Sequence, residues 1–146
     1  MEYLGMVIGQ GLVHMDPVKL STIRDWHPPS SVKGVHSFLG FANFYCKFIP
    51  NYSNIVAPIV LFTRKDYPWS WTKPQQNAFD SLHAIFSSTP VLCIPDVSCP
   101  FSLMTDASLL AAGAVLMQPD TSGDLHPCAY FSKTFFAVEQ NYDIYD

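Results

Sequence analysis

Carboxylates are the side chains in this sequence with the clearest catalytic potential, because they hold divalent metals and transfer protons. Asp106 is the main candidate, since it lies at the end of an apolar run that predicts a strand. A single carboxylate does not hold Mg²⁺ tightly, because this cation keeps its water unless several ligands converge. Taken alone, Asp106 is therefore expected to cap the turn after the strand.

Other arrangements with recognisable chemistry do not occur in the sequence. The four cysteines form no C-x-x-C pair, and the five histidines do not add zinc-ligand spacing to them. There is no Ser/His/Asp set and no glycine-rich phosphate loop. Asp16 and Asp25 are interpreted as a helix cap and a solvated helix residue. Nucleic-acid contact is the remaining candidate function.

A polar face on a helix predicted over residues 32–48 supplies the candidate contact surface. Gly40 would let the backbone approach a duplex closely, and its polar neighbours would meet sugar and phosphate without reading sequence. The alternative is an ordinary solvated helix face with a tolerated glycine. The candidate nucleic-acid-binding residues are Lys33, Ser37, Gly40, Asn43, Phe44 and Lys47.

The elements that position these residues are mainly helical over the first hundred residues. A hairpin is predicted over residues 3–15, with its turn at Gly9 to Gly11. Asp16, Ser30 or Ser31, and Thr72 are expected to cap helices. The predicted helices cover residues 18–26, 32–48, 53–63 and the stretch from Thr72 to Thr89.

The pattern changes to strands after a proline-punctuated stretch at residues 90–100. Strands are predicted over residues 101–106, 113–118 and 127–132, and the first turns of a helix over 138–146. The expected fold class is α+β, in which a helical region after a hairpin precedes a partial three-stranded sheet.

Composition indicates a folded chain with few charges. Apolar residues make up 49% of the chain and charged residues 14%, and the net charge is −4. This charge argues against a free-standing nucleic-acid binder, which usually has a basic face. No secretory signal is seen, and the longest small-apolar run, residues 109–117, is too short to cross a bilayer. We therefore expect an intracellular protein, in the cytoplasm or nucleus, without a membrane partner.

Four groups of motifs follow one another along the chain: Tyr3-Leu4-Gly5 with Met15-Asp16-Pro17; residues 37–45 with Phe48-Ile49-Pro50; Trp71 with Thr89-Pro90-Val91-Leu92; and Thr105-Asp106-Ala107-Ser108 with Gly113-Ala114-Val115-Leu116. In this order they resemble the polymerase-to-ribonuclease-H segment of gypsy-type retrotransposon and retroviral Pol polyproteins. The resemblance covers nearly the whole chain, although Cys46 stands where the family usually has a basic residue.

The resemblance implies three regions. Residues 1–66 would form a primer-grip-like hairpin and the helices of a reverse transcriptase thumb, which lies across the primer–template duplex. Residues 67–100 would form a connection. Residues 101–146 would form the opening part of a ribonuclease H-like domain.

The resemblance also implies Mg²⁺ in the parent family, with Asp106 as its first metal-binding aspartate. The next ligand would be a glutamate beyond Asp146, and the polymerase aspartates would precede Met1. We therefore expect an inactive fragment that binds no metal tightly. Two alternatives stay open: a non-enzymatic module that binds RNA–DNA or DNA duplex, or binds protein; and a chain completed by the missing remainder of the polyprotein.

Overall fold

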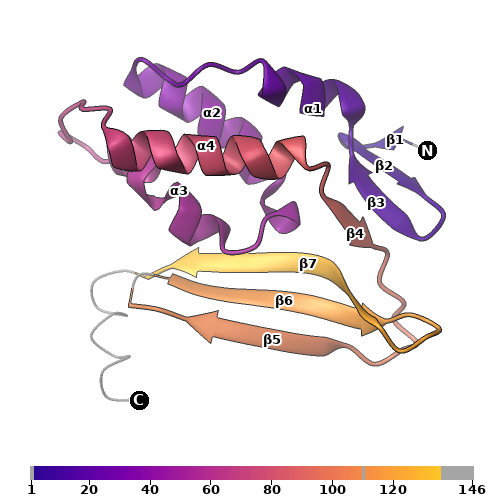
Figure 1. Ribbon diagram of the computed structural model, residues 1–146. Helices are drawn as coiled ribbons and strands as arrows, with labels where there is room; N and C mark the ends of the chain where they lie inside the picture. The colour runs from indigo at the N-terminus through magenta and orange to yellow at the C-terminus, as the bar shows by residue number, and fades with distance from the viewer. Residues whose placement is uncertain (1, 110, 136–146) are drawn as a thin grey trace.

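The computed structural model describes residues 2–109 and 111–135. Within them, four α-helices form one layer and a three-stranded antiparallel sheet forms a second layer beneath it (Figure 1). A small four-stranded sheet closes one end of the helical layer. The predicted α+β class is confirmed. The helix start predicted over residues 138–146 lies outside the described residues.

The four-stranded sheet contains the predicted hairpin. Gln10 and Gly11 both have positive φ, 53° and 76°, as the central residues of a type I′ turn require. A third strand precedes this hairpin, and a fourth arrives from far along the chain. The strands are β1 (Glu2–Tyr3), β2 (Met6–Gly9), β3 (Leu12–Met15) and β4 (Val91–Cys93), in the order β1-β2-β3-β4.

Strand β4 is absent from the sequence prediction, which gives residues 90–100 as irregular. In the structure Leu92 pairs with Val13 of β3, and its side chain is buried in the core. Strand β4 has three residues and lies between Pro90 and Pro95, so it is too short to show the alternation that identifies a strand. The pairing comes instead from the helix before β4, which returns the chain to the hairpin.

The helices begin where their capping residues predict. Asp16 accepts a hydrogen bond from the Val18 amide at 2.9 Å, and Ser31 accepts one from the Gly34 amide at 3.2 Å. The Thr72 amide donates to the Gln75 side chain at 3.0 Å. The helices are α1 (Pro17–Arg24), α2 (Val32–Phe44), α3 (Tyr52–Val60) and α4 (Lys73–Ser87).

Two helix ends differ from the prediction. The helix predicted over residues 32–48 ends at Phe44 and continues as the 3₁₀ turn η1 (Cys46–Phe48), and α3 likewise passes into η2 (Leu61–Thr63). Tyr45 and Phe48 are both buried, and a spacing of three residues keeps both on one side of a 3₁₀ turn. The same spacing also fits an α-helix, so hydrophobic periodicity does not show where the α-helix ends and the 3₁₀ turn begins.

One hydrophobic core contains the buried side chains of the hairpin, the helices and β4, from Met15 to Leu92. Its centre is aromatic: Phe38 of α2 lies 5.1 Å from Phe79 of α4 between ring centroids, and Phe41 lies 5.9 Å from Phe86. The residues expected in the thumb and in the connection thus contribute to the same core.

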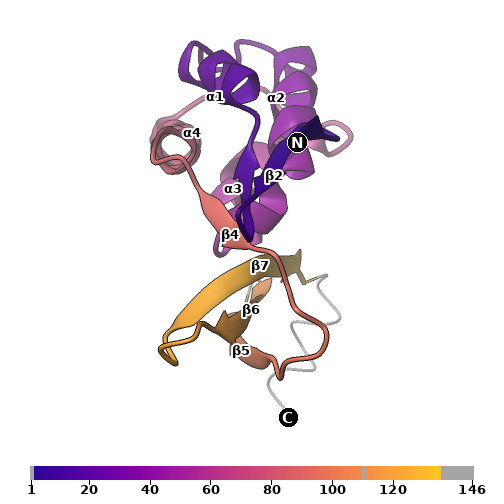
Figure 2. The same cartoon turned by 90° about the vertical axis from the view of Figure 1, so that its right-hand side faces the viewer.

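The second layer consists of β5 (Ser102–Ala107), β6 (Ala111–Pro119) and β7 (Leu125–Thr134), in that order. The three predicted strands are confirmed, each within two residues of its predicted bounds. Strand β7 lies against the helical layer and β5 lies farthest from it (Figure 2). Leu103 and Met104 of β5 are 62% and 51% exposed, so β5 is an open edge among the described strands.

Tyr52 at the start of α3 is a buried polar residue in this framework. Its hydroxyl donates a hydrogen bond to the side-chain oxygen of Asn43. Burial raises the pKa of the Tyr52 phenol well above its usual range, and the neighbouring Cys46 adds to this effect. The folded state therefore retains this proton at a pH where the unfolded chain releases it.

We predict that Tyr52→Phe lowers the free energy of unfolding by about 1 kcal/mol at neutral pH, through loss of this hydrogen bond. Above about pH 10, where an unfolded tyrosine ionises, the wild-type chain should lose stability and the variant should lose less. Urea unfolding between neutral pH and pH 11 tests both statements. Parallel pH profiles for the two proteins would contradict the assignment.

Candidate nucleic-acid interface and the Asp106 strand

Four of the predicted contact residues form one line along α2. Lys33, Ser37, Gly40 and Phe44 follow each other at steps of four, three and four, which places them on a single helical face. All four are exposed, and Phe44 is 54% exposed although it is apolar. The face therefore offers one cation, one hydroxyl, one open stretch of backbone and one ring to a partner.

Gly40 lies open at the middle of this line. A Cβ atom built on it would meet nothing within 4 Å. Beside it is a groove of about 320 Å³, to which Gly5 of the hairpin and Lys19 of α1 also contribute. Sequence reasoning missed Lys19, because only the packing of α1 beside α2 brings its cation to this face.

The hairpin is held against α2 by Tyr45. The Tyr45 hydroxyl donates to the Gly5 carbonyl at 2.9 Å, and burial, with a smaller effect from Asp16, raises the pKa of this phenol. Gly5 has φ of 77°, and a Cβ on it would lie 2.8 Å from the Tyr45 hydroxyl oxygen. This close contact requires glycine and fixes one wall of the groove.

Two further predicted residues do not lie on the line. Asn43 is occupied by the hydrogen bond from Tyr52. Lys47 belongs to η1, and its ammonium lies 5.8 Å from the centre of the Phe48 ring. The structure therefore brings together four of the six predicted residues and adds Lys19.

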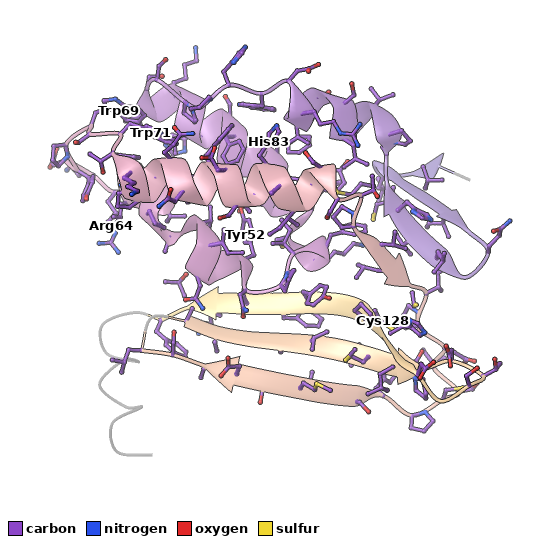
Figure 3. The ribbon with its side chains drawn as sticks, in the orientation of Figure 1. Tyr52, Arg64, Trp69, Trp71, His83 and Cys128 are labelled. Atoms are coloured by element: carbon purple, nitrogen blue, oxygen red, sulfur yellow. The ribbon has the colours of Figure 1, made fainter. Side chains whose placement is uncertain are left out.

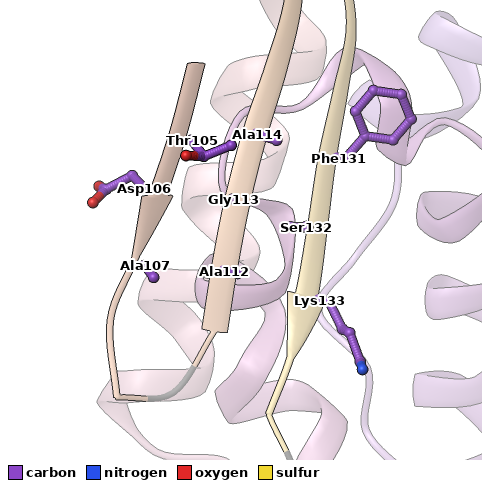
Figure 4. Close-up of a pocket in the computed structure, with 9 residues that line it drawn as sticks. All are labelled: Thr105, Asp106, Ala107, Ala112, Gly113, Ala114, Phe131, Ser132 and Lys133. Carbon is purple, nitrogen blue, oxygen red and sulfur yellow. The ribbon is translucent and has the colours of Figure 1, made fainter. Parts of the chain in front are cut away.

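Asp106 lies near the end of the outer strand β5, as predicted, and is exposed. Figure 4 shows its carboxylate pointing away from the Phe131 ring. It pairs with Gly113, which pairs with Ser132 of β7, so the three share one face of the sheet. A pocket of about 190 Å³ on this face is also lined by Asn51 from the helical layer.

One contact between the two layers is made at the start of α3, and β7 also lies against η1 and β4. Asn51 has left-handed backbone geometry, φ 55°, and makes no side-chain cap there. Ser132 supplies the acceptor instead: its hydroxyl oxygen accepts from the Ser53 amide at 2.9 Å and from the Ser53 hydroxyl at 3.0 Å. Gly113 makes room for this approach, since a Cβ on it would lie 2.7 Å from Asn51 Oδ1.

The described residues do not by themselves fit a complete magnesium site. Over residues 2–109 and 111–135, no group of three or more His, Cys, Asp or Glu side chains could hold a metal ion. Asp106 provides one carboxylate, whereas a two-metal site needs several that converge. Asp106 is therefore a single carboxylate near the end of β5, and a magnesium site there would need additional carboxylate ligands.

We predict that Gly113→Ala destabilises the chain by roughly 1–2 kcal/mol, because the added methyl group collides with Asn51. Adding Asn51→Gly should recover most of this loss, since glycine removes the collision and tolerates positive φ. A double-mutant cycle of urea unfolding measures the coupling. Gly9→Ala is the matched control, because a Cβ there meets nothing within 4 Å. A double variant no more stable than Gly113→Ala would contradict the proposed contact.

Comparison with known proteins places these features in a family. The model of the RNase H-like domain found in reverse transcriptase matches residues 71–146, more than half of the chain. The chain is 35% identical to the retrovirus-related Pol polyprotein from transposon opus of Drosophila melanogaster, over 97% of this chain and 15% of that protein. It is also 35% identical to the corresponding polyprotein from transposon gypsy of the same species, over 97% of this chain and 14% of that protein.

The fold agrees with solved structures of the foamy viral protease-reverse transcriptase. One of them, in complex with double-stranded DNA, has a TM-score of 0.77 at 23% identity, covering 96% of this chain and 25% of that chain. Within residues 2–109 and 111–135, no helix is long and apolar enough to cross a bilayer. The chain belongs to the family of RNase H-like domains found in reverse transcriptases, and it corresponds to a segment of the Pol polyproteins of gypsy-type retrotransposons and retroviruses.

Proposed function

We propose that this chain forms the thumb and connection of a reverse transcriptase with the first part of its ribonuclease H domain, and that its α2 face contacts a nucleic-acid duplex. The proposed regions are residues 1–66 for hairpin and thumb, 67–100 for the connection and 101–146 for ribonuclease H. The observation that carries the proposal is the exposed line from Lys33 to Phe44, with Gly40 open at its centre.

The chemistry of this face suits a sugar–phosphate backbone. Lys33 and Lys19 provide cations, Ser37 provides a hydroxyl, and Gly40 lets a duplex approach the helix backbone. None of these groups is arranged to read base edges, so the contact would be independent of sequence. The similar foamy viral structures are complexes with double-stranded DNA and with an RNA/DNA hybrid, which supports a duplex as the ligand.

The affinity of this face should be low and sensitive to salt. The whole chain carries a net charge of −4, and only two lysines serve the face. If both meet phosphates, the logarithm of the association constant should fall with the logarithm of salt concentration at a slope of about −2. An intracellular location, in cytoplasm or nucleus, belongs to the same proposal, because nucleic acid is the ligand.

A second candidate function is a protein-interaction module, and the exposure of Phe44 favours it. The Phe44 side chain is 54% exposed on the α2 face, and exposed aromatic residues contribute strongly to protein–protein contacts. Another segment of a Pol polyprotein would be one such partner, and it would also supply further carboxylates near Asp106. Duplex binding is preferred because Gly40 and Lys19 line the same groove as the ring, and Lys33 lies on the same helical face.

We predict that the chain binds a labelled RNA–DNA hybrid weakly, and that Lys33→Gln lowers the affinity while reducing the salt slope by about 1. Gly40→Val should weaken binding further, because its side chain blocks close approach, and the fold should tolerate it because a Cβ at this position meets nothing within 4 Å. Fluorescence anisotropy at two or more salt concentrations measures these effects.

The matched control for duplex binding is Arg24→Gln, which removes the same charge from the exposed end of α1, outside the groove beside Gly40. It should leave hybrid affinity unchanged. Equal losses for Lys33→Gln and Arg24→Gln would show general electrostatic attraction and would overturn the α2 assignment. Unchanged binding by Gly40→Val would do the same.

We also predict no magnesium-dependent cleavage of an RNA–DNA hybrid by this chain alone, because Asp106 lacks converging carboxylates among the described residues. The test follows a labelled hybrid in Mg²⁺, with Asp106→Asn as the control. Cleavage that disappears in Asp106→Asn would overturn the prediction and show that other groups complete the site. Cleavage restored by adding the downstream polyprotein segment would support Asp106 as the first ligand.

A further inference from the structure

The loop between η2 and α4 has an exposed surface that the proposed duplex contact does not use. Every residue from 63 to 70 is exposed. Within this loop Tyr67 and Trp69 are each 37% exposed although both are large and partly apolar. The loop lies at the end of the helical layer opposite the hairpin, where Figure 3 shows Arg64 and Trp69. We call Tyr67 and Trp69, with Arg64, Lys65 and Lys73, the aromatic shelf.

The two exposed rings of Tyr67 and Trp69 pack against the buried ring of Phe62. Trp69 lies 4.6 Å from the buried Phe62 ring between centroids, at an interplanar angle of 36°, and 6.1 Å from Trp71. Tyr67 meets the same Phe62 ring edge-on at 5.7 Å. Trp71 is fixed in turn, because its indole donates to Gln76 at 2.8 Å. A ligand ring that stacks here therefore meets side chains that lose little conformational freedom on binding.

The charge around the rings is positive although the chain is acidic. Residues 63–75 contain Arg64, Lys65 and Lys73 and one carboxylate, Asp66, in a chain of net charge −4. Within the part of the chain that the structure describes, none of the three cations forms an ion pair, because the pair found there joins His126 and Asp120. Among these residues, Arg64, Lys65 and Lys73 are therefore available for an anionic ligand.

A groove begins beside the shelf. Arg64 and Tyr67 line a space of about 590 Å³ together with Pro58 and Leu61 of the α3–η2 segment and Pro74 at the start of α4. Its walls are mainly apolar, and Arg64 is the charged residue among those that line it. This combination accepts a planar, weakly polar ring next to a negatively charged group.

We propose that the aromatic shelf binds single-stranded nucleic acid. Bases would stack on Tyr67 and Trp69, and phosphates would pair with Arg64, Lys65 and Lys73. A single strand fits better than a duplex, because the faces of paired bases are covered by their neighbours. A nucleic acid fits better than a protein, because residues 63–75, which carry the two rings, contain three cations and one carboxylate. The site is separate from the α2 face and does not depend on duplex binding there.

The test compares two labelled oligomers of about twelve nucleotides, a length within the range that single-strand sites cover. One is oligo-deoxythymidine, and the other is an abasic strand with the same phosphates. Wild-type chain should bind the first roughly tenfold more tightly than the second, since stacking contributes only to the first. Binding should also quench tryptophan fluorescence, and the Trp69→Leu variant should show less quenching.

Variants separate stacking from charge. Trp69→Leu and Tyr67→Leu keep apolar bulk over Phe62 but remove the aromatic faces, so they should lower affinity for oligo-deoxythymidine severalfold and leave abasic affinity unchanged. Arg64→Gln and Lys65→Gln should lower affinity for both oligomers. Lys33→Gln is the matched control and should affect hybrid binding alone. Circular dichroism and thermal unfolding confirm that each variant is folded.

Three results would overturn the proposal. Equal affinity for the abasic and base-containing strands would exclude stacking. Equal losses for Lys65→Gln and Lys33→Gln would exclude a local site. No measurable binding of either oligomer, with the α2 variants still changing hybrid affinity, would leave the shelf as a protein contact while the duplex proposal stands.

Discussion

The packing of α4 across the other helices is the constraint on which the rest of the structure depends. Phe79, Leu82 and Phe86 are 4%, 0% and 0% exposed and recur at steps of three and four, so one stripe of α4 fills the centre of the core. Loss of one such side chain typically costs 2–5 kcal/mol, roughly half of a small domain's stability. Phe38 and Phe41 of α2 contact this stripe at Phe79 and Phe86, and both also contact Trp26.

The same helix determines where the chain goes next. Its fifteen residues span about 22 Å, enough to carry the chain from the loop end of the helical layer back to the hairpin end. There β4 pairs with β3 before the chain enters the lower sheet. The linker after β4 is fixed by Gln118, whose side-chain amide donates to the carbonyls of Asp96 at 2.7 Å and Cys99 at 3.2 Å. The lower sheet is therefore tied to the core at the linker and, through Ser132, at α3.

Local signals in the sequence were sufficient for much of this fold. The Asp16, Ser31 and Thr72 caps are found where predicted, because a cap depends only on residues within one helical turn. The three strands of the lower sheet were also predictable, since turn residues separate apolar runs. Strand β4 was not, because its pairing partner lies about eighty residues away and its three residues show no period.

The candidate sites divide in the same way. Helical spacing alone places Lys33, Ser37 and Gly40 on one face of α2. It could not supply Lys19, which reaches that face through tertiary packing, nor show that Asn43 is occupied by Tyr52. The contact of Asn51 with Gly113 was equally hidden, because it joins two layers whose relative position depends on the linker and on β7.

The two proposed surfaces differ in how they would attract nucleic acid. The α2 face has two lysines, Lys33 and Lys19, and little stacking area, so its affinity would be almost wholly electrostatic and would fall steeply as salt rises. The aromatic shelf adds two supported rings to its three cations, and stacking persists when charges are screened. At physiological salt the shelf should therefore retain more of its low-salt affinity than the α2 face. An acidic chain can have this second surface because a screening length of about 8 Å confines the repulsion from its carboxylates to their neighbourhood.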